Sequence, residues 1–178
     1  MAAIDDFKSN LLGGGARTNQ FRVTITEPSG IAIGLDVRRT SFLCKATTLP
    51  AVELQPITLK YRGRSVIIAG DRETTGTWST TFYMDTDFMI MNALQRWSNG
   101  INDFDLNTGV ASLSDYATDL TAEMIDRDDT VLKTYIFKNA WPLVVGAPPA
   151  LDSAGDNTIG EFECTWQYQN YSISGVNF

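Results

Sequence analysis

Residues 161–168, Glu-Phe-Glu-Cys-Thr-Trp-Gln-Tyr, alternate strictly between polar and apolar side chains. Side chains two residues apart lie on the same face of a β-strand, so this segment predicts a strand with one dry face and one wet face. Residues 77–85, Thr-Trp-Ser-Thr-Thr-Phe-Tyr-Met-Asp, follow the same period, and their threonines suit an extended chain. Both segments favour an antiparallel sheet with a core on one side.

The same alternation recurs along most of the chain. Strands at about 116–125 and 131–137 flank residues 126–129, which predict a hairpin turn. Trp141-Pro142 is expected to end the second strand, because proline cannot donate a hydrogen bond inside a sheet. The segment 159–168 is expected to be the last strand. Shorter strands are expected at 21–26, 41–46, 57–61 and 65–69.

The hydrophobic period changes once, after Asp85-Thr86-Asp87. There the apolar residues recur every three positions, as Phe88, Met91, Leu94 and Trp97. The pattern predicts one helix over 87–97, capped by an acid or threonine and stopped at Asn99-Gly100. The expected fold is therefore mainly β: an antiparallel β-sandwich or barrel-like subunit with one packed α-helix.

The length of 178 residues and the hydrophobic content of 43% are enough for one domain with a substantial core. Gly13–Gly15 predicts a flexible joint, so residues 1–16 are expected to be an arm ahead of a single β domain at 17–171. The first eight residues contain two acids and no long apolar run. They are therefore expected to be neither a secretory signal nor a membrane anchor.

The composition excludes several classes of function. The chain has 14 Lys plus Arg, 21 Asp plus Glu and no histidine, which gives a net charge of −7. Histidine-dependent triads and histidine-ligated metal sites are excluded, and two cysteines cannot form a four-thiolate zinc site. Cys44 and Cys164 lie in apolar strand contexts and are expected to be buried, reduced thiols. The acidic balance also argues against a nucleic-acid coat or a binder of anionic membranes.

Residues 103–109, Asp-Phe-Asp-Leu-Asn-Thr-Gly, resemble the start of a calcium loop. The glycine falls one position late, and Ser114 stands where a bidentate glutamate is required. A polar loop is the better interpretation, as it is for the acids of the 126–129 turn. No metal or other cofactor is expected.

Glu161 and Glu163 would project from one strand face about 7 Å apart, a spacing that could serve glycoside hydrolysis. An alternating polar face produces the same spacing by default, so we expect no catalytic residues. The segment 60–64, Lys-Tyr-Arg-Gly-Arg, interleaves bases with an aromatic ring. Given the overall acidity, we expect these bases to pair with acids on a neighbouring subunit or strand.

Five segments, in their order along the chain, carry a family resemblance. They are Phe42–Pro50, Ala69–Arg72 followed by Trp78, the helix with Trp97, Trp141–Gly146 with Asn157, and Phe162–Thr165. Together they resemble the tail tube proteins of contractile-tailed bacteriophages over about residues 19–171. The chain departs from that family at 31–38, at 147–156 and in a C-terminal tail at 172–178.

The resemblance implies a non-enzymatic structural subunit of the virion, assembled in the host cytoplasm. It implies homohexameric rings stacked into a tube, inside a sheath and between baseplate and terminator proteins, through which double-stranded DNA passes. Two alternatives remain: a tube of a secretion system or tailocin that carries no DNA, and a carbohydrate-binding or carbohydrate-hydrolysing sandwich.

Two strand faces are candidates for the wall of the tube, and the pattern does not choose between them. An acidic wall would repel the phosphates of passing DNA. The candidate lumen residues are Asp119, Thr121 and Glu123, or Glu161, Glu163, Thr165 and Gln167. The candidate contacts between rings or subunits are Phe7, Leu49, Pro50, Arg62, Arg64, Asp71 and Arg72.

Overall fold

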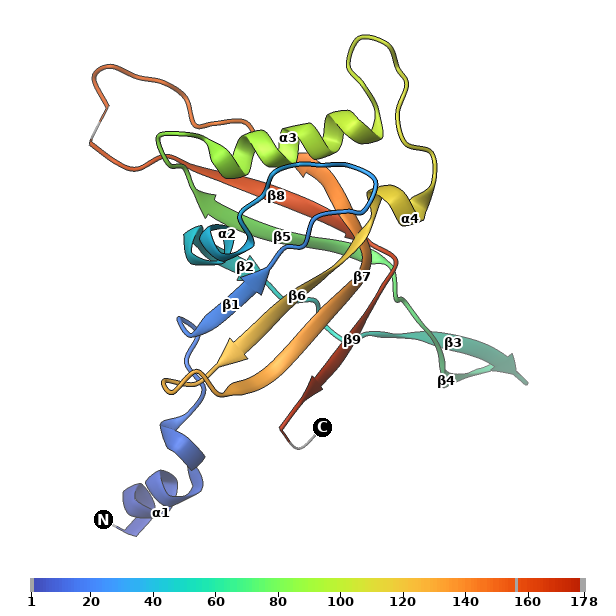
Figure 1. Cartoon of the computed structure of the whole chain (residues 1–178). Coiled ribbons are helices and arrows are strands. Elements are labelled where there is room, and N and C mark those ends of the chain that lie inside the picture. Colours follow the sequence, from blue (N-terminus) through green and yellow to red (C-terminus); the bar gives the residue numbers. More distant parts are fainter. Residues whose placement is uncertain (1, 156, 177–178) are drawn as a thin grey trace.

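The computed structural model describes residues 2–155 and 157–176 (Figure 1). The body of the protein is built on one curved, seven-stranded antiparallel sheet that closes around a core. In one half lie β1 (Phe21–Thr24), β6 (Thr118–Ile125), β7 (Val131–Val145) and β9 (Asn170–Gly175). In the other half, β7 continues beside β8 (Glu161–Tyr168), β5 (Gly76–Tyr83) and β2 (Cys44–Thr48).

The long strand β7 belongs to both halves. Its first part pairs with β6 and β9, and from Trp141 onward it pairs with β8. Asn139, with φ of 51°, lies where the partners change. A residue in this conformation bends a strand, as in a β-bulge, so the two halves can face each other across the core.

Aromatic rings fill the space between the halves. Trp78 stacks on Phe137 with ring centroids 4.3 Å apart, and Trp166 contacts both Trp78 and Trp97. Trp97 comes from the helix α3 (Met89–Ile101), which lies across the sheet and covers this part of the core (Figure 1). These side chains are at most 1% exposed, so they provide a large share of the apolar burial that stabilises the domain.

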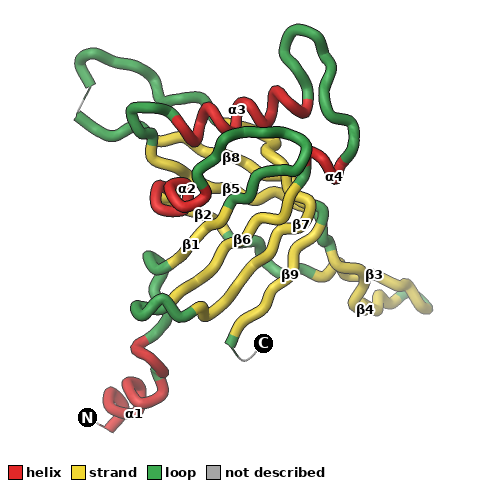
Figure 2. Tube along the Cα trace, viewed as in Figure 1, coloured by secondary structure: helices red, strands yellow, loops and turns green. Residues whose placement is uncertain are grey.

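Besides its loops, two elements of regular secondary structure project from this body (Figure 2). Among the described strands, β3 (Leu54–Tyr61) and β4 (Arg64–Arg72) pair only with each other and form a hairpin. Arg62 and Gly63 both have positive φ, as a two-residue hairpin turn requires. At the other side, the helix α1 (Ala2–Asn10) leads through a 3-10 turn at Leu12–Gly14 to β1.

Most expected elements are confirmed. Strands occupy the segments predicted at 57–61, 65–69, 77–85, 116–125, 131–137 and 159–168, and α3 occupies the predicted helix. The turn at 126–129 is closed by the backbone N–H of Asp126, which donates to Thr130 O at 2.8 Å. The N-cap of α3 is Phe88, in the left-handed region with φ of 53°, and not an acid or threonine as expected. The side chain of Asp87, one residue earlier, still accepts from the N–H of Met89 at 3.1 Å. The helix ends at Ile101 rather than at Asn99.

The expectation of a single helix is wrong. Helix α2 (Val37–Leu43) begins after Asp36, whose side chain accepts from the N–H of Arg39 at 3.1 Å. The first half of the strand expected at 41–46 is therefore helical, and β2 starts only at Cys44. A short helix α4 (Leu113–Tyr116) and α1, within the expected arm, are further additions.

Two expectations at the C-terminal end are also wrong. Trp141-Pro142 does not end β7: Pro142 lies opposite Trp166, and the strand continues to Val145 after a register shift between Pro142 and Val144. Strand β8 is not the last strand, because β9 pairs with the first part of β7. Residues 172–175 of the expected tail therefore lie in a sheet, and residues 177 and 178 lie outside the described residues.

Candidate assembly surfaces

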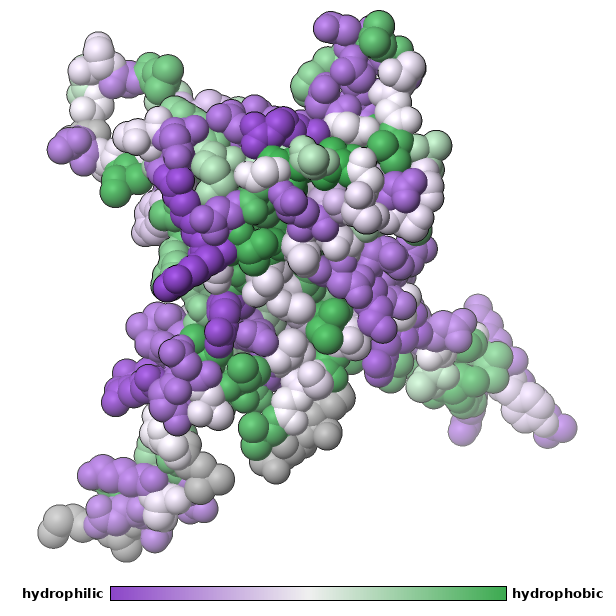
Figure 3. Space-filling model, viewed as in Figure 1, coloured by the Kyte–Doolittle hydropathy of each residue, from purple (hydrophilic) through white to green (hydrophobic). Residues whose placement is uncertain are grey.

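The β3–β4 hairpin has one apolar face. Residues paired across an antiparallel ladder share a face, so Ile57 lies beside Ile68, and Leu59 beside Val66. These four side chains are 45–50% exposed, and Tyr61 continues the face at 66%. The opposite face mixes Thr58, Lys60 and Ser65 with one large apolar residue, Ile67. Figure 3 shows green atoms gathered on the hairpin, with purple atoms around them.

The hairpin is also basic. Its four bases and one acid give a net charge of +3, so the rest of the chain carries −10. Arg62 and Arg64 lie at the tip, where the guanidinium of Arg62 sits 5.3 Å from the ring centroid of Tyr61. Asp71 and Arg72 lie at the base. The predicted contact residues of this segment are therefore all exposed on one projecting ribbon.

The other predicted contact residues are dispersed. Phe7 is 66% exposed on α1, where it lies one turn from the exposed Ile4, and the exposed Leu11 follows directly after the helix. Leu49 and Pro50 are half-buried in the link between β2 and the hairpin. The hydroxyl of Tyr171 donates to Ala51 O in the same link at 3.0 Å, which ties the base of the hairpin to β9.

The first candidate lumen face lies on β6. Asp119, Thr121 and Glu123 point away from the core, as the alternation predicted. An ion pair joins Glu123 to Arg22 of β1 at 3.1 Å. Asp119 accepts from the N–H of Asn139 at 3.0 Å. With Lys138 also exposed on this side, acids and bases are balanced on the face.

The second candidate face lies on β8, in the other half of the sheet. The Nζ of Lys45 on β2 donates to both carboxylate oxygens of Glu161, at 2.6 and 2.7 Å, and this raises the pKa of Lys45. Glu163 is exposed, with Thr165 and Gln167 half-buried beside it. The structure thus separates the two candidate faces, and on each of them one acid, Glu123 or Glu161, forms an ion pair with a base of the neighbouring strands.

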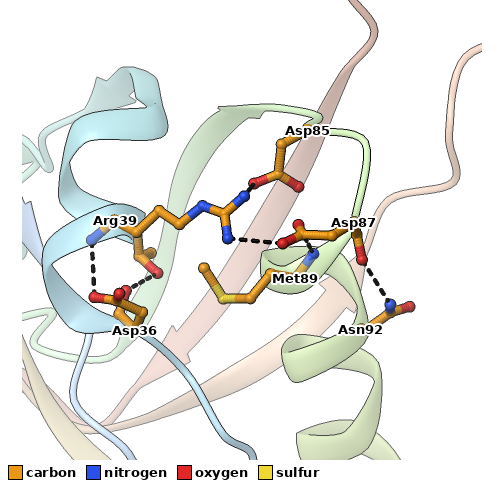
Figure 4. Close-up of polar contacts among 7 residues, drawn as sticks. Asp36, Arg39, Asp85, Asp87, Met89 and Asn92 are labelled. Carbon is orange, nitrogen blue, oxygen red and sulfur yellow. Dashed lines mark hydrogen bonds and ion pairs between the residues drawn. The ribbon is translucent and has the colours of Figure 1, made fainter.

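Acids outnumber bases in the loops instead. Figure 4 shows one such place, where the guanidinium of Arg39 on α2 lies 2.8 Å from Asp85 and 2.7 Å from Asp87. The hydrogen bond to Asp87 raises the pKa of Arg39 and lowers that of Asp87. Asp36 is a third acid in the same cluster. These contacts fasten α2 to the turn before α3.

A groove of about 910 Å³ lies next to this cluster, beneath the loop that joins β7 to β8. Phe88 and Met84 form part of its wall, and Leu151 and Ile159 of the loop are 98% and 68% exposed. Sequence reasoning missed this groove and the apolar face of the hairpin. The alternation in the hairpin was visible, but alternation does not say whether the chain's own core covers a face.

Catalytic and metal-binding chemistry has no support in the described residues. They contain no group of three or more acidic or thiol side chains placed to hold a metal ion. Cys44 and Cys164 are buried and free, and burial raises the pKa of both thiols, that of Cys44 to about 12. Among the described helices, none is long and apolar enough to cross a membrane.

Residues 16–174 match the family model of a phage tail tube protein. The tail tube protein of Serratia phage KSP90 is 29% identical over 170 residues, covering 94% of this chain and 95% of that protein. Tail tube protein gp19 of Enterobacteria phage T4 is 29% identical over 154 residues, covering 86% of this chain and 88% of gp19.

Solved structures show the same fold. A chain of the PVC sheath-tube complex, from an extracellular contractile injection system in the extended state, has a TM-score of 0.63 at 16% identity and covers 94% of this chain and 97% of its own. A chain of the tube terminating cap of the anti-feeding prophage has a TM-score of 0.62 at 16% identity, and the match covers 90% of this chain and 91% of the cap chain. The family match spans nearly the whole fold, and the chain therefore belongs to the phage tail tube proteins as a structural tube subunit.

Proposed function

We propose that this protein assembles into hexameric rings that stack into the tail tube through which double-stranded DNA leaves the virion. The observation that carries the proposal is the β3–β4 hairpin, whose apolar face is about half exposed. An isolated two-stranded hairpin is marginally stable in water, and an exposed apolar patch marks an interaction site. In a tube of identical subunits, a second copy of the chain would cover this apolar face.

Several copies are needed to enclose a channel. A domain of this length has a radius of gyration of about 16 Å, and β-barrels hold aqueous channels only from about 16 strands upward. The half formed by β2, β5, β8 and the end of β7 offers four strands per copy. Six copies would give a barrel of about 24 strands, which is wide enough by this rule.

We propose that the β8 face of this half, with Glu161, Glu163, Thr165 and Gln167, lines the channel. The hairpin supports this choice, because β3 follows β2 and β4 precedes β5, so the hairpin extends the same pair of strands. Lys45 neutralises Glu161, which leaves the carboxylate of Glu163 beside the hydroxyls of Ser79, Thr81 and Thr165. Such a wall offers DNA few cations to bind and repels phosphate mildly.

The proposed partners follow from the related assemblies. The similar solved structures come from a sheath-tube complex, a sheath/tube terminator and a baseplate. We propose corresponding partners for this chain, with assembly in the host cytoplasm. The alternative is a tube of an injection system or tailocin without DNA, which the fold of these structures also fits. The phage origin of the relatives at 29% identity favours the DNA-carrying tube.

Electron microscopy of the purified protein tests the proposal. We expect rings with six-fold symmetry, or tubes, over a range of ionic strength and protein concentration. Absence of both under all conditions would contradict self-assembly. A second test asks whether the tubes of ejecting particles contain DNA that is protected from nuclease. Protected DNA would support the DNA-carrying tube, and its absence would support the tube of an injection system or tailocin.

A further inference from the structure

We infer that the groove beneath the β7–β8 loop is the receiving site for the β3–β4 hairpin of an adjacent copy. The inference rests on the proposed tube assembly and names the two surfaces that join its subunits. Both surfaces are apolar and exposed, they lie on the same chain, and their charges are opposite in sign.

The groove offers a large apolar surface. Its volume is about 910 Å³, and its lining combines the wall residues Met84 and Phe88 with the loop residues Leu151 and Ile159. Phe88 is 42% exposed, and the two loop residues are far more exposed. Pro148 and Pro149 complete the loop side and restrict its backbone. The apolar side chains of the hairpin could therefore pack against apolar side chains of the groove.

The charges are complementary. The groove lining includes three acids and no base: Asp85, Asp152 and Glu161. Arg39 and Lys45 pair with the first and the last of these, and Asp152 forms no ion pair among the described residues. Asp87 adds a further acid beside Asp85. The hairpin, with a net charge of +3, therefore faces an excess of carboxylates.

The positions of the two surfaces favour a contact between copies. In Figure 1 the hairpin and the β7–β8 loop project from opposite ends of the body. A hairpin strand of eight residues extends about 26 Å, at about 3.3 Å per residue, so its tip can reach well beyond its own domain. Joining two different patches of one chain is a heterologous contact, which generates rings or continuous stacks rather than closed dimers.

Cross-linking within assembled protein tests the contact directly. The variant Leu59→Cys/Leu151→Cys places one thiol on the apolar hairpin face and one in the groove. Because the native thiols are buried, they should react little with a short bis-maleimide. We expect a ladder of covalent multimers.

Two matched control variants each move one of the two thiols away from the proposed contact. Ile67→Cys/Leu151→Cys uses the opposite hairpin face, and Leu59→Cys/Leu106→Cys uses an exposed leucine of the 102–112 loop, outside the groove. Both should remain largely monomeric on a denaturing gel. Equal ladders from a control and the test pair would overturn the assignment.

A substitution in the groove gives a second readout. Leu151→Asp should greatly reduce tube yield without lowering the melting temperature of the monomer, whereas Leu106→Asp should leave both unchanged. If Leu151→Asp forms tubes normally, the groove is not the receiving site. The same follows if the Leu59→Cys/Leu151→Cys variant forms tubes but does not cross-link. Either result would leave the proposed function intact. Failure of the unmodified protein to form rings or tubes contradicts the proposed function itself.

Discussion

Trp78 and Phe137 stack with ring centroids 4.3 Å apart and ring planes inclined by 15°. Trp78 lies on β5 and Phe137 on β7, so the pair joins the two halves of the curved sheet. The indole N–H of Trp78 donates to Oγ1 of Thr47 at 2.7 Å, which satisfies its polar atom inside the core. The pair is therefore a direct contact between the half that contains β5 and β8 and the half that contains β6 and β9.

Phe137→Ala should destabilise the monomer by about 3–5 kcal/mol, because it removes a buried ring and leaves a cavity. Urea unfolding followed by tryptophan fluorescence measures the change. Phe104→Ala, at a side chain that is 82% exposed, is the control and should change stability by less than about 0.5 kcal/mol. Equal effects of the two substitutions would contradict the central role of the stack.

Leu59→Asp should abolish or strongly reduce tube formation, because it places a charge in the middle of the apolar hairpin face. Ile67→Asp adds the same charge to the opposite face of the same ribbon, so it is a matched control. Electron microscopy and sedimentation measure assembly, and thermal melting should be nearly identical for both variants. Equal loss of tubes would show that the two hairpin faces are not distinguished.

Deletion of residues 1–12 should weaken polymerisation more than it weakens folding. Helix α1 makes no extensive contact with the strands of the body among the described residues, and its side chains Ile4 and Phe7 are 62% and 66% exposed. A helix of nine residues is marginal on its own, so a contact between subunits would stabilise it. Comparing tube yield with the melting temperature decides the matter, and equal losses in both would contradict the expectation.

The Arg39–Asp87 contact should make stability depend on pH. A lowered pKa of Asp87 means that the folded state favours the ionised carboxylate. Its contribution is present above the unfolded-state pKa of about 4 and is lost as the pH falls through the lower folded pKa. Asp87→Asn should therefore flatten the fall in melting temperature below about pH 4. Asp71→Asn removes an exposed acid without a hydrogen bond or ion pair among the described residues, and should leave the slope unchanged.

Glu163→Lys should leave tubes intact and slow the release of DNA, if the β8 face lines the channel as proposed. The substitution adds a cation beside the phosphates at a position that repeats in every subunit. Single-particle ejection kinetics measure the effect, and Asp119→Lys on the other candidate face is the matched comparison. Slower release with Asp119→Lys alone would assign the lumen to the β6 face instead.

Much of the fold could be predicted from local sequence patterns. Alternation over 161–168 places Phe162 and Trp166 in the core because the period of a strand is a property of its backbone. The break in period after Asp87 likewise predicted α3. Helix α2 escaped this reasoning because seven residues are too few to establish a period, although Asp36 was available as its cap.

The assembly surfaces could be predicted only in part. The bases at the hairpin tip were expected to meet acids elsewhere, and the structure places them on a projecting ribbon with an unpaired apolar face. The groove could not be predicted, because its lining joins the segment 84–88 to the segment 148–161. Contacts between segments so distant in sequence depend on the path of the whole chain.

The sequence by itself determined the strand faces, the absence of histidine chemistry and the net charge of −7, since each follows from residue identity or local spacing. Only the tertiary structure decided how that charge is distributed over the surface of the protein. It pairs Lys45 with Glu161 and Arg22 with Glu123, so the strand faces are nearly balanced and the acidic excess lies in the loops. The physical reason is that Coulomb energy depends on distance in space, and folding brings together charges that lie far apart along the chain.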